Sequence, residues 1–200
     1  MTIDLILAFN LALLAALVSP GPALLLSLRT ALVKGRGAGI QVGIGLAFAA
    51  ACWTAAALMG LDGLFAAFPW AYTGMKIIGA LYLFHIAWQA WRDARQRVED
   101  DQPVANHNVF DGILLNLSNP KSVLFAAAVL VVIFPPDLSL FEMSFIIANH
   151  FVIEVCFYSL FAIALSTQTM SNRYLAVKTW FDRAAAVVMA GLGLRLLLQR

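Results

Sequence analysis

Long apolar runs without charged residues dominate this sequence. No Asp, Glu, Lys or Arg lies between Leu5 and Leu28 or between Gly37 and Leu61, and a helix needs about 20 apolar residues to cross a bilayer. The chain of 200 residues is 62% hydrophobic and only 12% charged, whereas soluble domains carry roughly 25% charged residues. The sequence therefore predicts an integral membrane protein, because a soluble core could not bury this much apolar surface.

The alternation of apolar and polar segments predicts an all-α, polytopic membrane protein with six transmembrane helices. The predicted helices cover residues 3–28, 39–61, 69–91, 111–134, 141–166 and 182–198. They form a single transmembrane domain, 1–200. Its expected parts are a first three-helix repeat in 1–91, a mixed-charge cytoplasmic linker in 92–108 and a second three-helix repeat in 109–200.

Lys and Arg gather at one end of the predicted helices. They follow the first, third and fifth helices, at Arg29, Lys34, Arg36, Arg92, Arg95, Arg97, Arg173, Lys178 and Arg183. The segments 62–68 and 135–140 contain neither residue type. Basic loops favour the cytoplasmic side. We therefore expect a multi-pass protein of the cytoplasmic (inner) membrane with both termini outside, which gives the two repeats opposite, inverted topology.

Two proline-containing segments interrupt the first helix of each repeat. They are Ser19-Pro20-Gly21-Pro22 and Asn119-Pro120-Lys121. Proline has no N–H and clashes with the carbonyl four residues back, so the carbonyls of Ala16, Val18 and Asn116 should lack helical partners. Broken backbone at membrane depth is tolerated where it lines a cavity, and transporters commonly bind substrate there. The two breaks therefore predict the substrate site.

A stripe of ionisable side chains lies on the fifth predicted helix. His150, Glu154 and Tyr158 are four residues apart, so they share one helical face. A charge at mid-bilayer costs about 2.5–3.5 kcal/mol on insertion scales, so Glu154 should face the protein interior. The stripe is a candidate proton-responsive wall, with Lys121 as the expected partner of Glu154. A purely structural Lys121–Glu154 pair that joins two helices explains the same residues.

Several motifs in order resemble the LysE/RhtB family of amino-acid exporters. They are Pro20-Gly21-Pro22 followed by 34–39, Gly43 and Gly45; 79–83 with Trp88 and Arg92; 112–117 with Asn119, Pro120, Lys121 and Phe125; and 191–195. The resemblance covers essentially the whole chain. It implies a secondary transporter that exports amino acids or close derivatives.

The chain departs from the family pattern at one place. Many members carry a Gly-Asp pair in the second helix, where this chain has Ala49 and Ala50. If that acid takes part in ion coupling, this chain must use another group. Proton antiport remains the expected mechanism, because no nucleotide-binding motif is present for direct use of ATP.

The predicted substrate-binding residues are Ser19, Pro20, Gly21, Pro22, Asn116, Asn119, Pro120 and Lys121, and the predicted coupling residues are Glu154, His150 and Tyr158. Helix N-termini at the breaks would bind the substrate carboxylate. The open carbonyls, with Glu154, would receive its ammonium group. The expected partners are an amino acid, protons and membrane lipid, and a homodimer is compatible with a chain this small; no nucleic acid, cofactor, bound metal or catalytic residue is expected. The alternatives are a cation or metal exporter, a membrane enzyme and a non-transporting membrane subunit.

Overall fold

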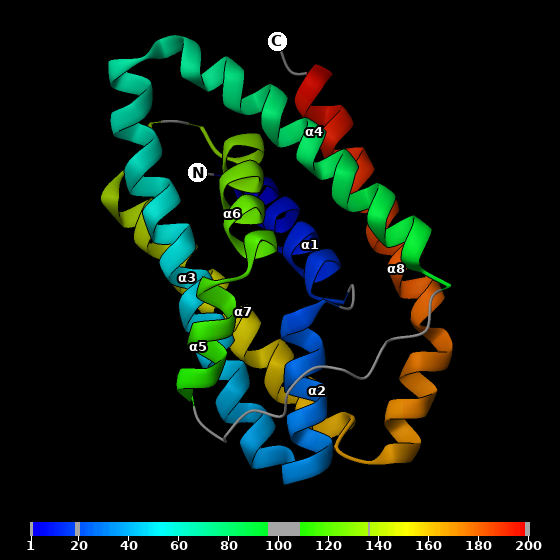
Figure 1. Cartoon of the computed structure of the whole chain (residues 1–200). Coiled ribbons are helices and arrows are strands. Elements are labelled where there is room, and N and C mark those ends of the chain that lie inside the picture. Colours follow the sequence, from blue (N-terminus) through cyan, green and yellow to red (C-terminus); the bar gives the residue numbers. More distant parts are fainter. Residues whose placement is uncertain (1, 19–20, 96–108, 136, 199–200) are drawn as a thin grey trace.

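The computed structural model describes residues 2–18, 21–95, 109–135 and 137–198, and these residues form eight helices and no strands (Figure 1). The predicted all-α class is confirmed for this part of the chain. The helices are α1 (Ile3–Val18), α2 (Pro22–Lys34), α3 (Arg36–Ala67), α4 (Pro69–Asp93), α5 (Val109–Leu117), α6 (Pro120–Ile133), α7 (Leu140–Ala164) and α8 (Gln168–Leu198).

Each predicted helix that contains a proline segment consists of two helices. The axis bends by 60° between α1 and α2 and by 68° between α5 and α6. Pro22 and Pro120 stand in the first turn of α2 and α6, where a missing N–H removes no helical hydrogen bond. The prolines therefore end one helix and begin the next, as the sequence predicts.

Four segments of the described chain have the length and hydropathy of a membrane span. Two are unbroken, Arg36–Gly60 and Leu140–Ala164, and two are the bent pairs α1–α2 and α5–α6. The helices α4 and α8 are not among these four segments, and α8 carries charged residues along its first half. The two to four candidate spans support a multi-pass membrane protein, while the arrangement of six spans as inverted repeats stays a prediction.

Three helix ends differ from the predicted ones by six residues or more. The last helix begins at Gln168 rather than 182, α2 continues to Lys34 rather than ending at 28, and α3 continues to Ala67 rather than ending at 61. The sequence predicts Arg173 and Lys178 in a basic loop after the fifth helix, but the Lys178 side chain is buried in α8 and pairs with Asp182. Pairing inside the protein allows a charged segment to join an otherwise apolar helix.

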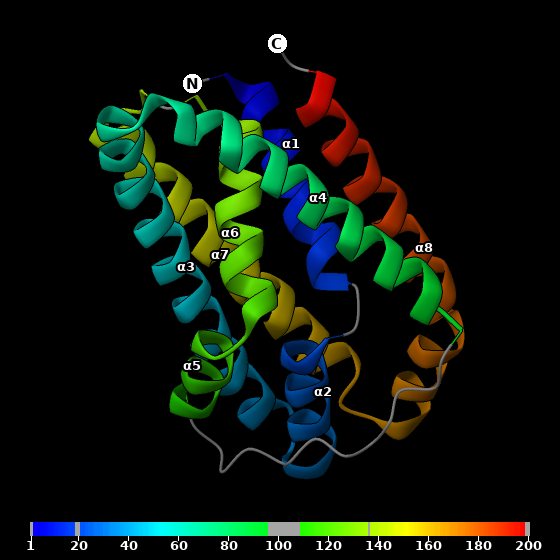
Figure 2. The same cartoon turned by 45° about the horizontal axis from the view of Figure 1, so that its top comes forward.

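The helices form two packed pairs with the broken helices between them. Helix α3 packs along α7, and α4 packs along α8. Figures 1 and 2 show α1 and α6 between these two pairs, with α5 beside the lower part of α3. The core takes large buried side chains from six helices: Phe9, Leu13, Leu46, Leu83, Leu130, Ile146 and Met189.

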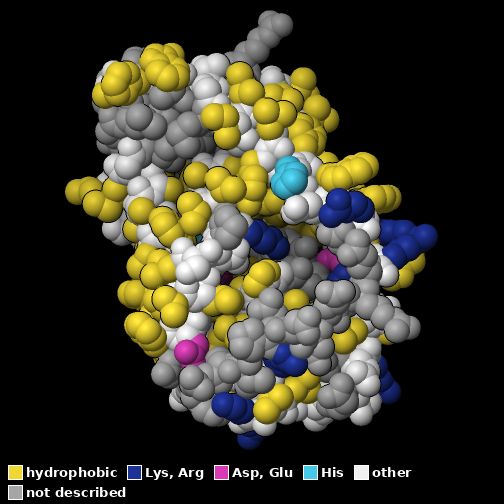
Figure 3. Space-filling view, in the orientation of Figure 1, with side chains coloured by type: hydrophobic (Ala, Val, Ile, Leu, Met, Phe, Trp, Pro, Cys, Tyr) yellow, Lys and Arg dark blue, Asp and Glu magenta, His cyan; other side chains and the backbone are white. Residues whose placement is uncertain are grey.

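The two ends of the molecule differ in charge. Helix α1 begins and α8 ends at the same end of the molecule (Figure 2). Hydrophobic side chains cover the part of the surface nearest that end, and Lys and Arg gather on the middle and opposite part (Figure 3). This is the charge distribution on which the predicted topology depends.

Glycines allow α3 and α5 to touch along their backbones. A Cβ atom added to Gly112 would lie 2.1 Å from the carbonyl oxygen of Val42, and one added to Gly45 would lie 1.9 Å from that of Val109. No side chain fits at such distances. The α5 half of the second break is thereby held directly against α3.

We expect Gly112→Ala to destabilise the protein, because the new methyl group would force α5 away from α3. Inserting a methyl group into a well-packed core typically costs about 1–3 kcal/mol. The measurement is the midpoint of thermal unfolding of purified protein in detergent. The matched control is Gly60→Ala in α3, where an added Cβ meets no described atom within 4 Å; equal midpoints for the two variants would contradict the close contact.

Candidate functional site

Both helix breaks and the ionisable stripe of α7 border one cavity of about 60 Å³. At roughly 15 Å³ for each water position, it has room for about four waters. Its apolar wall contains Leu13, Leu17, Leu24 and Phe125, and its polar wall contains Asn116, Asn119, Lys121, Ser122, His150, Glu154 and Tyr158. The structure thus brings residues that are more than 130 positions apart, such as Leu13 and Glu154, into one site.

Most of the predicted site residues lie in this cavity. Gly21, Asn116, Asn119 and Lys121 line it, as do all three predicted coupling residues. Pro22 is exposed and does not contribute to the lining. Ser19 and Pro20 lie outside the described residues, and Pro120 is described only as the first residue of α6.

The second break is fixed by two asparagine side chains. Asn119 caps α6, because its Oδ1 accepts a hydrogen bond of 3.0 Å from the Lys121 backbone N–H. Asn116 donates from Nδ2 to the Leu46 carbonyl of α3 at 2.6 Å, and its Oδ1 accepts from the Ser122 hydroxyl. A buried amide that makes such bonds is held in one orientation. The break is therefore a rigid, polar part of the cavity wall.

The carbonyls freed by the prolines have partners. Lys121 donates from Nζ to the Ala16 carbonyl at 3.3 Å, and Tyr174 of α8 donates to the Val18 carbonyl at 3.1 Å. The Asn116 carbonyl accepts from the Asn119 N–H at 3.2 Å. The carbonyls expected to be open for substrate are therefore occupied in this state, and two of the donors come from the opposite half of the chain.

Glu154 is paired with His150 rather than with Lys121, the partner that the sequence had predicted. His150 Nε2 lies 3.1 Å from Glu154 Oε1, and His150 Nδ1 lies 2.7 Å from the Thr54 hydroxyl of α3. A neutral imidazole protonated on Nε2 satisfies both bonds. The other carboxylate oxygen, Glu154 Oε2, is buried without a hydrogen-bond partner among the described residues. Since Glu154 also lines the cavity, this oxygen is an unused acceptor at the site.

Sequence reasoning missed Thr54 and Ser122. Thr54 is the only Ser or Thr in the charge-free run from Gly37 to Leu61. An isolated hydroxyl in a membrane helix usually has a hydrogen-bond partner, so the sequence did indicate that Thr54 bonds to another residue. Ser122 directly follows the break and was not distinguishable from an ordinary first-turn serine.

Aromatic and amide contacts close the cavity on the side where α1 begins. The Phe9 ring lies against both Phe134 and His150, with ring centroids 5.6 and 5.5 Å apart. Next to it, Asn149 Nδ2 of α7 donates to Asn10 Oδ1 of α1 at 2.7 Å. Phe9 is 1% exposed, so its ring is fully packed within the protein. These contacts join the first and second halves of the chain.

The sequence model of the LysE type translocator family matches residues 14–200. The chain belongs to this family. It is 24% identical to the threonine efflux protein of Escherichia coli (strain K12) over 94% of each chain. It is 25% identical to that of Salmonella typhi over 98% of this chain and 100% of the relative. It is also 28% identical to an uncharacterized membrane protein of Pseudomonas aeruginosa over 92% and 88% of the two chains. No solved structure matches.

The comparisons confirm the predicted family and support amino-acid export at the level of the family. They also agree with a transporter rather than an enzyme. All residues that line the cavity lie within the matched region except Leu13, which directly precedes that region. The residues of the cavity are thus part of what the family match covers.

We expect Asn119→Ala to lower the stability of the protein, because it removes the N-cap of α6. Loss of such a cap costs about 0.5–2 kcal/mol. Asn119→Ser should retain most of the stability, since a serine hydroxyl also accepts from the first turn. Thermal unfolding in detergent measures both, with Ser118→Ala at an exposed neighbouring position as the control. If Asn119→Ser were as unstable as Asn119→Ala, the cap would not be the reason.

Proposed function

We propose that this protein is a secondary transporter that exports amino acids or close derivatives across the cytoplasmic membrane. The observation that carries the proposal is the single cavity on which both helix breaks and Glu154 converge. Membership of a translocator family and the names of the threonine efflux relatives support the class of substrate.

The cavity offers complementary groups to an amino-acid zwitterion. The N-terminus of α6, with the Lys121 ammonium beside it, provides the positive end that a carboxylate requires. Glu154 Oε2 provides a buried acceptor for an ammonium group. A buried carboxylate oxygen without a donor costs about 1–3 kcal/mol or more, so binding of an ammonium group there relieves an existing penalty.

The same oxygen provides a simple mechanism for proton antiport. Glu154 Oε2 can hold either a proton or the substrate ammonium group, but not both. The bonds from Thr54 to His150 and from His150 to Glu154 keep the carboxyl group in place during the exchange. A proton that moves down 100 mV supplies about 2.3 kcal/mol, which sustains roughly a fifty-fold gradient of an uncharged solute.

Alternating access would arise from two three-helix halves of opposite topology, with both termini outside. Helices α3 and α7 hold the same place in their halves, as do α4 and α8, and each packs against its counterpart. Such reciprocal contacts are compatible with a two-fold relation between the halves. The Asn10–Asn149 bond and the Phe9 contacts would then be the outer closure, which opens when the halves rock apart.

A cation or metal exporter remains the second candidate. His150 and Glu154 would supply two ligands. In the described part of the chain, no group of three or more His, Cys, Asp or Glu residues could hold a metal ion. The amino-acid proposal uses the breaks and the acid together, whereas the metal proposal leaves the breaks without a role.

In inverted membrane vesicles that contain this protein, we expect labelled amino acids to accumulate when the vesicle interior is acidified. Glu154→Gln should reduce proton-driven accumulation about tenfold or more, since a charge-assisted hydrogen bond contributes about 1.5–3 kcal/mol. It should also flatten the pH dependence, because glutamine does not titrate. The rate of uptake across a panel of amino acids and pH values is the measurement.

Glu142→Gln is the matched control, because Glu142 lies on the same helix in the capping box at its start, away from the cavity lining. A glutamine preserves that capping box, so this variant should transport normally. Uptake that depends on a divalent metal alone would favour the metal exporter. Failure of the well-expressed wild-type protein to transport any amino acid would refute the proposed function.

A cross-link between Asn10→Cys and Asn149→Cys should stop transport, because the two side chains meet across the proposed outer closure. Cys52 and Cys156 are exposed free thiols, so both are first replaced by alanine. Uptake should be lost after mild oxidation and return after reduction. Each single cysteine variant is the control, and full transport by the cross-linked protein would show that this contact does not open.

A further inference from the structure

A second cavity lies outside the proposed substrate site, as an open groove between α4 and α8. Its volume is about 590 Å³. Phe84, Trp88 and Trp91 of α4 form one wall, and Ala186 and Ala190 of α8 form part of the other. Trp88 is 65% exposed and Trp91 is 53% exposed. The groove is therefore lined mainly by aromatic and small apolar side chains, with the exposed imidazole of His85 among them.

The groove has the length of one leaflet of a bilayer. Its α4 wall runs from Leu81 to Trp91, which at 1.5 Å per residue is about 15 Å, half of the 30 Å hydrocarbon core. Close packing of the two helices shuts one end: a Cβ atom on Gly193 would lie 3.2 Å from the Ala80 carbonyl. At the other end, the Thr179 hydroxyl of α8 donates to the Ala94 carbonyl at 2.9 Å. The groove between these two contacts is thus long enough for a single acyl chain.

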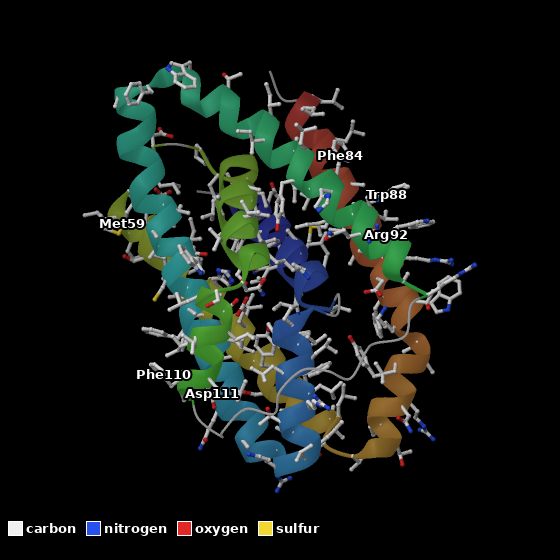
Figure 4. All side chains as sticks on the ribbon, in the orientation of Figure 1. Met59, Phe84, Trp88, Arg92, Phe110 and Asp111 are labelled. Carbon is white, nitrogen blue, oxygen red and sulfur yellow. The ribbon has the colours of Figure 1, made fainter. Side chains whose placement is uncertain are left out.

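Basic side chains stand at the end of the groove that is nearest the C-terminus of α4. The Arg183 guanidinium carbon lies 5.3 Å from the centroid of Trp91 and 5.9 Å from that of Trp180. Arg183 Nε is buried without a hydrogen-bond partner among the described residues. Figure 4 shows Phe84, Trp88 and Arg92 one turn apart along α4, so the same helix face passes from apolar to basic. The apolar groove therefore ends beside arginine side chains, whose guanidinium groups are hydrogen-bond donors.

We propose that this groove binds one acyl chain of an anionic phospholipid, with the lipid phosphate held at Arg183. A guanidinium group matches the geometry of a phosphate, and tryptophan favours the level of the lipid headgroups. Basic pockets between membrane helices bind anionic headgroups in the same way. The acyl chain of a zwitterionic lipid would fit the groove equally well. Its headgroup would be attracted less strongly by the basic end, because it has no net charge. This site does not depend on the proposed transport function.

The test compares phosphatidylglycerol with phosphatidylcholine as ligands of the purified full chain in detergent. Native mass spectrometry should detect retained phosphatidylglycerol, and this lipid should raise the thermal unfolding midpoint more than phosphatidylcholine does. Arg183→Gln should weaken phosphatidylglycerol binding about tenfold and phosphatidylcholine binding by a smaller factor, because both lipids carry a phosphate but only phosphatidylglycerol has a net negative charge. Val187→Trp should fill the groove from an exposed position in its lining and weaken both lipids.

Arg173→Gln is the matched control, because Arg173 is an exposed arginine of α8 outside the groove. Equal binding of the two lipids by the wild-type protein would overturn the proposal, as would an equal effect of Arg173→Gln and Arg183→Gln. If Val187→Trp converted a lipid-free dimer into a monomer while Arg183→Gln changed no lipid binding, the groove would be an interface between two copies of the chain. That result would also overturn the lipid site.

Discussion

The hydrogen bonds that satisfy the broken helices are the constraint on which the rest of this structure depends. In a bilayer core no water is present to bond to a carbonyl that proline has freed, so a partner must come from the protein. Lys121 and Tyr174 supply it for Ala16 and Val18, each across a long separation in sequence. These bonds tie α6 and α8 to the end of α1. The need to satisfy the breaks therefore places the halves of the chain against each other and surrounds the cavity with polar groups.

Glu154 differs from the other buried acceptors around the cavity in its hydrogen bonding. Every carbonyl that the prolines free has a donor, whereas one oxygen of this buried carboxyl group has none among the described residues. If this carboxyl group served only to stabilise the packing, a second hydrogen-bond donor would make the protein more stable, since an unpaired buried acceptor is destabilising. An acceptor that must exchange one donor for another has to be left open. Ala50 of α3 lines the same cavity, and Glu154 of α7 is the acidic side chain in its lining.

The local parts of this arrangement could be predicted from sequence, and the pairings between distant residues could not. Proline chemistry predicted both breaks, and four-residue spacing predicted that His150, Glu154 and Tyr158 share a buried face. The wrong partner for Glu154 had a physical cause: charge alone favoured Lys121, but Lys121 bonds to a carbonyl that only the fold brings near. Thr54 lies 96 residues from His150, and no local pattern joins them. Lys178 and Asp182 are also four residues apart, so their pairing was readable from the sequence, but the burial that lets this charged pair belong to α8 depends on packing against distant helices.

Helix α4 connects the lipid groove with the transport cavity. The Tyr82 hydroxyl donates at 3.3 Å to the carbonyl of Lys121, the second residue of α6. Its neighbours Leu81 and Phe84 line the groove on the other side of the same helix. A change in the spacing of α4 and α8 would therefore displace Lys121, whose side chain donates to the Ala16 carbonyl. In the proposed alternating-access mechanism α4 and α8 belong to different halves, so rocking of the halves would change that spacing, and an acyl chain in the proposed lipid groove would favour one of the two arrangements.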